Sequence, residues 1–187
     1  MKEKKFLQKN AGKPARWLMA TGFALTLALG LCVTGGISNQ ITVYAEGEVA
    51  SGSLGSNATG TITGNATDGY TLTVSGSGEI TYDDGWRNEY EANITTVVIE
   101  AGITGIGTSS FRGFTRLASV TSPSTVTGIG NMAFESCKSL TAIVIPEGVT
   151  SIGQQAFYGC EALASVTIPS TVTDIGAYAF QMCKALA

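Results

Sequence analysis

The sequence predicts a repeat solenoid of stacked coils, with a parallel β-sheet on one face, short helical or 3₁₀ turns on the other, and a β cap in front. Two observations predict this fold class. From residue 94 onward, apolar residues, glycines and phenylalanines recur every 23 residues, and a fixed period of this size is typical of stacked repeats. Within each period, a short stretch of alternating apolar and polar residues is expected to form one strand.

Residues 1–45 have the features of a secretory signal peptide. Six basic residues precede a largely apolar run from Trp17 to Val33, and the small-residue pattern of a cleavage site follows at Val43-Tyr44-Ala45. We expect cleavage after Ala45, with an uncleaved N-terminal anchor as the alternative. Leu31 precedes Cys32 where a lipoprotein signal needs a small residue, so lipidation is disfavoured. The membrane is therefore expected as a partner only during export.

Residues 46–69 are rich in Gly, Ser, Thr, Asn and Ala. Such a composition buries too little apolar surface to offset the entropy of the chain, so we expect a flexible linker. The alternation of Thr61-Ile62-Thr63 leaves an additional strand of the cap as the alternative.

Residues 70–93 are expected to form an N-terminal β cap and a loop. Leu72 and Val74 alternate with threonines, as in a strand with one buried face. Their side chains would cover the open edge of the first coil.

Residues 94–187 hold four units of 23 residues, and the chain ends as a fifth begins at Leu186. The period is shown by several columns of equivalent positions: Ile94, Leu117, Leu140, Leu163; Val97, Val120, Ile143, Val166; Ile106, Ile129, Ile152, Ile175; Gly107, Gly130, Gly153, Gly176; Phe111, Phe134, Phe157, Phe180. In units two to four a proline stops the strand, and the glycine column is expected to supply a tight turn. The sequence A-F-x-x-C is expected to form one helical or 3₁₀ turn. Because nothing caps the fourth unit, we expect the chain to be a fragment of a longer protein.

The repeated pattern I-P-x-x-V-x-x-I-G-x-x-A-F-x-x-C-x-x-L resembles the BspA-like leucine-rich repeats of bacterial surface proteins. The resemblance covers residues 94–187, and the segment from Tyr70 to Ile80 looks like the β segment that often precedes such repeats. Unit one departs from the pattern at Glu100, Ser110 and Phe114, as terminal repeats often do. The resemblance implies a solenoid of the leucine-rich-repeat type, display at the bacterial surface or secretion, and adhesion to host or neighbouring-cell macromolecules.

Composition and charge argue against several function classes. The chain has no histidine, the commonest general base and metal ligand, and nothing in it indicates an enzyme. From Glu46 onward five basic residues face thirteen acidic ones, a net charge of −8. An acidic body disfavours nucleic acid as a partner, because binding phosphate requires Lys and Arg.

The cysteines and acids of the body suggest no cofactor or metal site. Cys137, Cys160 and Cys183 share one column, which Phe114 fills in unit one, so buried free thiols are favoured over a disulfide. Thiols in a line do not form a tetrahedral zinc site. The acids around Trp86 do not follow an EF-hand spacing, which favours a solvated loop. The charges of Lys138, Glu161 and Lys184 are expected to form an exposed ladder.

The remaining candidate site is the outer face of the strands. Small, uncharged side chains are predicted to point outward there: Thr96, Val98, Ser119, Thr121, Ala142, Val144, Ser165 and Thr167. They would form either a ligand platform or a neutral face shaped by β-propensity alone. The leading hypothesis is an exported adhesion module that binds an extracellular protein or glycoprotein. The alternative is a structural spacer that presents another domain.

Overall fold

The computed structural model describes residues 48–82 and 87–187 of the chain. The predicted signal peptide with its cleavage site after Ala45 lies outside these residues, and so does Trp86 with Asp83 and Asp84. Among the described residues, no helix is long and apolar enough to span a membrane.

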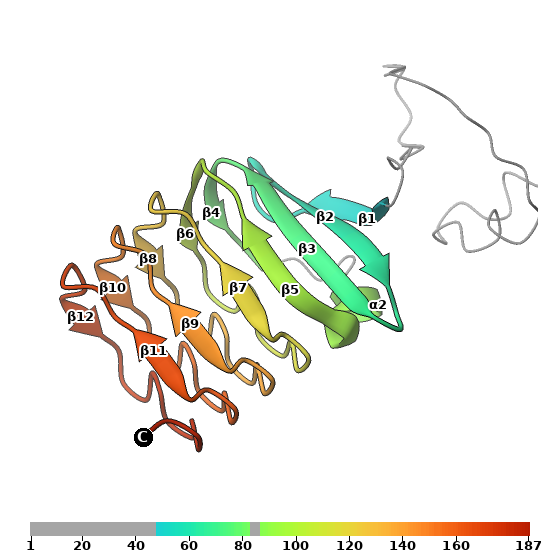
Figure 1. Cartoon of the computed structure of the whole chain (residues 1–187). Helices are drawn as coiled ribbons and strands as arrows, with labels where there is room; N and C mark the ends of the chain where they lie inside the picture. The colour runs from blue at the N-terminus through green and yellow to red at the C-terminus, as the bar shows by residue number, and fades with distance from the viewer. Residues whose placement is uncertain (1–47, 83–86) are drawn as a thin grey trace, which may run out of the picture. The chain divides into compact units, whose positions relative to one another are not determined.

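The repeats form a β-solenoid with one row of strands on each of two sides (Figure 1). The first side, which we call the front, holds β5 (Ile94–Ile99), β7 (Ser119–Thr121), β9 (Ala142–Val144) and β11 (Ser165–Thr167). The second side, the back, holds β6 (Ile103–Ile106), β8 (Gly128–Ile129), β10 (Ser151–Ile152) and β12 (Asp174–Ile175). All strand pairs within the repeats are parallel, which confirms the predicted solenoid.

Columns of equivalent apolar residues fill the space between front and back. The rings of Phe111, Phe134, Phe157 and Phe180 stack at centroid distances of 5.2–5.3 Å. The first three are fully buried, and so are Leu117, Leu140 and Leu163. Each rung shares its core with the rungs on either side, because a single rung has too few apolar side chains to enclose its own.

The back of the solenoid differs from the expected turns, because it carries a second parallel sheet in the order β12-β10-β8-β6-β4. The glycine column beside it allows close approach of the rungs. The expected tight turn begins at these glycines, because the carbonyl of each accepts a hydrogen bond from the amide three residues further on, at 3.2–3.4 Å. None of these glycines has a positive φ. A Cβ on Gly153 would lie 2.5 Å from the carbonyl carbon of Gly130, and one on Gly176 would lie 2.4 Å from the amide nitrogen of Gln154.

The A-F-x-x-C segments form turns, and none of them is helical, in contrast to the expected helical or 3₁₀ turn. Two positions in each turn have a left-handed backbone; Ser109 and Gly113 hold them in the first rung. As a result, every second amide of the turn donates its hydrogen bond to the next rung, and the amides between them donate within their own rung. Ser109, Phe111 and Gly113 donate to the carbonyls of Asn131, Ala133 and Glu135 at 2.8–2.9 Å. We call these bonds, with their equivalents in later rungs, the turn ladder.

The N-terminal side of the solenoid is covered by two strands. β3 (Gly69–Gly76) pairs in parallel with β5, which places Leu72 opposite Val97 and Val74 opposite Ile99. β4 (Gly78–Ile80) pairs in parallel with β6. A short helix, α2 (Arg87–Tyr90), and a 3₁₀ turn, η1 (Glu91–Asn93), lead into β5.

Two further strands occupy residues that composition assigns to a flexible linker, so the linker expected over 46–69 is wrong over 48–65. The alternative, an additional cap strand at Thr61-Ile62-Thr63, is confirmed. β1 (Glu48–Ser53) and β2 (Ala58–Asn65) form antiparallel pairs that extend the sheet to the order β1-β2-β3-β5-β7. Leu54 and Ile62 are fully buried. Gly60 faces the same core, where a Cβ would lie 2.8 Å from Leu54 and 3.0 Å from Leu72. Glycine here therefore makes room for two leucines.

The last rung exposes side chains that earlier rungs bury. Ile168 and Ile175 are 41% and 51% exposed, whereas their equivalents Ile145 and Ile152 are 2% and 1% exposed. The amides of Tyr178, Phe180 and Met182 correspond to turn-ladder donors, yet no hydrogen bond to an acceptor in the described part of the chain is seen for them.

Candidate functional site: the outer strand face

The structure places the eight predicted face residues on the outward side of β5, β7, β9 and β11, two on each strand. Their neighbours in the same strands, such as Val97 and Ile143, point into the core. Thr96 and Val98 are half-buried, and the other six are exposed, with Val144 at 68%. The strand period of two explains this arrangement, because alternate side chains point to opposite faces.

Strand register aligns these side chains within two pairs of strands, and the 23-residue repeat continues the two rows from β7 to β9, which belong to separate sheets. Thr96 pairs with Ser119 and Val98 with Thr121, while Ala142 pairs with Ser165 and Val144 with Thr167. Within the first row the hydroxyl of Ser119 lies 3.4 Å from that of Thr96 and donates to it. The structure therefore brings all eight residues together on one face.

Both rows continue into the cap, which the sequence prediction missed. Thr71 is paired with Thr96 and Thr73 with Val98, so β3 adds a member to each row. On β2, Thr63 pairs with Thr71 and Thr61 with Thr73. The sequence carries a signal for this extension, because threonine alternates with other residues at 59, 61 and 63 and again at 71 and 73.

The face is uncharged over most of its width. The residues of the two rows on β2, β3, β5, β7, β9 and β11 are Thr, Ser, Val or Ala, with neither a charged nor an aromatic side chain among them. A charged residue, Glu48, is paired in register with Thr63 at the outer edge of the sheet. We call this surface, from β2 to β11, the hydroxyl face.

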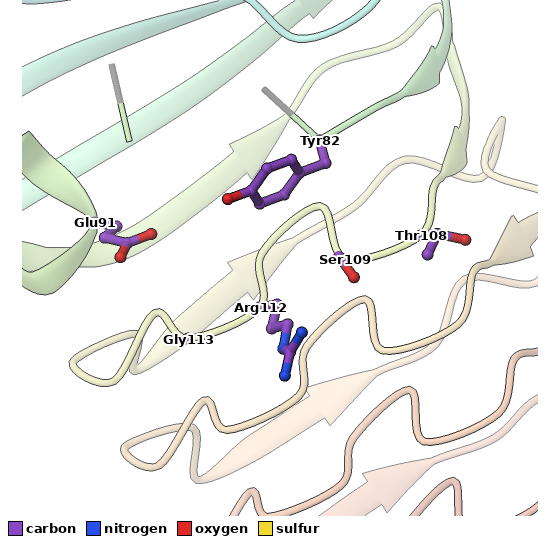
Figure 2. A pocket seen from close by; sticks show the side chains of 6 residues that line it. All are labelled: Tyr82, Glu91, Thr108, Ser109, Arg112 and Gly113. Atoms are coloured by element: carbon purple, nitrogen blue, oxygen red, sulfur yellow. The ribbon is translucent and has the colours of Figure 1, made fainter. Parts of the chain in front are cut away.

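A hollow of about 560 Å³ lies away from the hydroxyl face, at the first turn (Figure 2). Tyr82 and Glu91 lie on one side of it, and Ser109 and Arg112 lie on the turn opposite. Arg112 also forms an ion pair with Glu135 of the next rung, with 2.9 Å between Nε and Oε2. The guanidinium thus links two rungs as well as lining the hollow.

A second, smaller hollow of about 340 Å³ lies on the back. Its floor is the backbone of Gly105 and Gly128, which are neighbours in register, and Glu79 and Ser151 stand at its ends. The hollow lies where these two glycines leave neighbouring positions of β6 and β8 without a side chain.

The three body cysteines are buried free thiols. Each donates to a carbonyl of the preceding rung; Cys160 Sγ lies 3.1 Å from the oxygen of Phe134. Burial raises the pKa of Cys160 to about 12, and it raises the pKa of Cys183 as well. A thiol that stays protonated is a poor nucleophile and a poor metal ligand. In the described ranges, no group of three or more Cys, Asp or Glu side chains could hold a metal ion.

The predicted charge ladder is present on the turn side. Lys184 Nζ lies 2.7 Å and Lys138 Nζ 3.9 Å from the carboxylate of Glu161. The hydrogen bond and charge of Lys184 lower the pKa of Glu161. All three side chains are largely exposed to solvent, which screens such pairs, so they contribute little to stability.

Comparisons with known proteins agree with this architecture. Residues 89–187 match the family described as "BspA type Leucine rich repeat region (6 copies)". A leucine rich cell surface protein from Faecalibacterium prausnitzii is 30% identical, with a TM-score of 0.55 over 68% of this chain and 36% of that one. A leucine-rich repeat protein from Eubacterium ventriosum is 25% identical, with a TM-score of 0.54 over 73% and 42%.

The leucine-rich repeat protein of T. pallidum is 27% identical, with a TM-score of 0.52 over 63% of this chain and 62% of that one. This chain therefore spans less than half the length of the F. prausnitzii and E. ventriosum chains. A search of the curated proteins gives no match.

Proposed function

Because this chain belongs to the BspA-type leucine-rich repeat family, we propose that it is an exported bacterial binding module that adheres to macromolecules through its hydroxyl face. The observation that carries the proposal is the pair of outward rows, whose side chains are held in register by the hydrogen-bonded strand pairs β5–β7 and β9–β11. The sheet holds these groups in place before a ligand arrives, which reduces the entropy lost on binding. No catalytic residue is assigned.

Surface location is supported by two observations. The N-terminal sequence has the features of a signal peptide, and the F. prausnitzii neighbour is described as a cell surface protein. We propose secretion or surface display on this basis, with an extracellular macromolecule as the ligand.

The proposal is tested by binding of the compact unit, residues 44–187, to immobilised matrix proteins, mucins and glycans. Val144→Lys places a charge at a position of the face that is 68% exposed. Ser124→Lys adds the same charge at an exposed corner that follows β7 and serves as the matched control. Circular dichroism establishes that all three proteins are folded.

Saturable binding by the wild type and Ser124→Lys, reduced at least about tenfold in Val144→Lys, is the expected result. Equal binding by both variants would place adhesion elsewhere on the molecule. A folded wild type that binds none of these ligands would contradict the adhesion module and favour a spacer.

A further inference from the structure

We propose that the ligand of the hydroxyl face is an uncharged, extended polysaccharide that lies across the strands, and that the cap strands β2 and β3 form part of the same site. This inference rests on the proposed function and names the chemical class of its ligand.

The geometry of the face favours a long, repetitive ligand. Neighbouring strands lie about 4.8 Å apart, so the rows from β2 to β11 extend over about 24 Å. Strand register within each sheet, and the 23-residue repeat from β7 to β9, place Thr63, Thr71, Thr96, Ser119, Ala142 and Ser165 in one row and Thr61, Thr73, Val98, Thr121, Val144 and Thr167 in the other. Four of six positions in the second row, and five of six in the first, carry a hydroxyl group.

The spacing of these hydroxyls matches the repeat of a sugar chain. An extended β-linked hexose polymer advances by a distance close to one strand spacing per sugar, so successive sugars would meet successive strands. Each hydroxyl donates one hydrogen bond and accepts others, which suits the hydroxyls of a sugar. Val98 and Val144 supply apolar contacts for the C–H groups of the pyranose rings.

The side chains of the face disfavour other partners. Strong protein interfaces are enriched in Trp, Tyr and Arg, and the hydroxyl face has none of these. Nucleic acids, anionic lipids and sulfated glycans need Lys or Arg, which are likewise missing from its rows. A neutral polymer with many hydroxyl groups needs neither kind of side chain.

Single contacts on such a face are weak, and their number provides the affinity. One neutral hydrogen bond contributes about 1 kcal/mol, a factor of about five in binding. A polymer that spans six strands makes many such contacts from one preorganised surface, which multiplies their effect.

The test measures retention of residues 44–187 on three groups of ligands. The uncharged probes are cellulose, chitin and mannan, the charged probes are heparin and polygalacturonate, and the protein probes are matrix proteins and deglycosylated mucin. Thr61→Val removes one hydroxyl on β2 and keeps a β-branched side chain of similar size. Val144→Lys tests the repeat half of the face, and Ser124→Lys is the control. Each variant is first shown to unfold at the wild-type temperature.

We expect binding to at least one uncharged polysaccharide, with little change between low and high salt. Thr61→Val should weaken it about fivefold and Val144→Lys at least about tenfold, while Ser124→Lys binds like the wild type. Wild-type affinity in Thr61→Val would exclude the cap from the site and overturn that part of the proposal.

Binding to the protein probes alone, lost in Val144→Lys, would overturn the polysaccharide and leave the adhesive face standing. Binding to the charged probes alone would also overturn it. Retention on none of the three groups would contradict the polysaccharide and the proposed function together.

Discussion

The ring of Phe157 lies 5.2 Å from that of Phe180, with the two planes 1° apart. On its other side Phe157 stacks on Phe134 at 5.2 Å and 5°. Phe157 is therefore enclosed between two rings and is fully buried, whereas Phe180 has one stacking partner in the described chain and is half-buried. The same residue type thus stands in two different environments within one column.

Because the two rings differ in burial, replacing each by alanine should lower the free energy of unfolding by different amounts. Phe157→Ala should lower the free energy of unfolding by about 3–5 kcal/mol, because it leaves a cavity between neighbouring rungs. Phe180→Ala should cost less, because solvent already reaches that ring. Urea unfolding followed by circular dichroism measures both. Equal costs would show that the last rung is as tightly enclosed as the third.

The glycines of the back provide a matched pair of substitutions. Gly153→Ala should destabilise by about 1–3 kcal/mol, because its Cβ would lie 2.5 Å from the carbonyl carbon of Gly130. At Gly128 a Cβ would meet only the hydroxyl of Ser151 at 3.5 Å, and the φ is not positive. Gly128→Ala should therefore be neutral, or more stable by about 0.4–1 kcal/mol. Equal melting temperatures for the two variants would contradict close approach as the reason for the Gly153 column.

The buried thiol of Cys160 predicts a loss of stability in alkali. Its pKa rises from 9.0 to about 12, chiefly because burial disfavours the thiolate. Between these values the folded chain keeps a proton that the unfolded chain releases, so stability falls as the pH rises from about 9 towards about 12. Unfolding of the wild type and of Cys160→Ala over this range measures the effect. The free energy of unfolding of Cys160→Ala should fall less steeply with pH than that of the wild type. Parallel pH curves for the two proteins would contradict a role for this thiol.

The cap strands predict that the Gly/Ser/Thr-rich segment is part of the folded core. Ile62→Ala should cost about 2–5 kcal/mol, because Ile62 is 1% exposed and lies opposite Leu72 in register. Thr59→Ala, at an exposed position of the same strand, should change stability little. Thermal unfolding compares the two. A neutral Ile62→Ala would show that β2 contributes little to the fold.

Sequence periodicity predicts the solenoid because the residues of each column, such as the phenylalanines, occupy the same packing position in every rung. It does not predict β1 and β2, which occur once. Gly60 stands at an inward position of β2, where a side chain would collide with Leu54 and Leu72, so the apolar alternation that marks a strand is interrupted. Composition then suggests a linker, although the segment buries Leu54 and Ile62 completely.

The candidate face is predicted in the same uneven way. Its eight repeat residues follow from strand alternation, and their outward positions agree with the structure. The four threonines of β2 and β3 belong to the same rows only through strand register, which depends on how the cap pairs with β5. No local pattern in the sequence specifies that pairing.

The turn ladder gives the solenoid a net dipole along its stacking axis. In a strand the peptide dipoles alternate and nearly cancel. In the turns the donating amides of every rung point the same way, from Ser109, Phe111 and Gly113 in the first rung to Gln155, Phe157 and Gly159 in the third. Their dipoles therefore add along the stack, as they do in an α-helix.

The donor side of each turn faces the next rung, and the acceptor side faces the preceding one. The C-terminal side of a rung is therefore its positive side, which carbonyl oxygens complement and a second set of amide donors would oppose. The turn ladder thus lets rungs stack in one direction only, by charge as well as by shape.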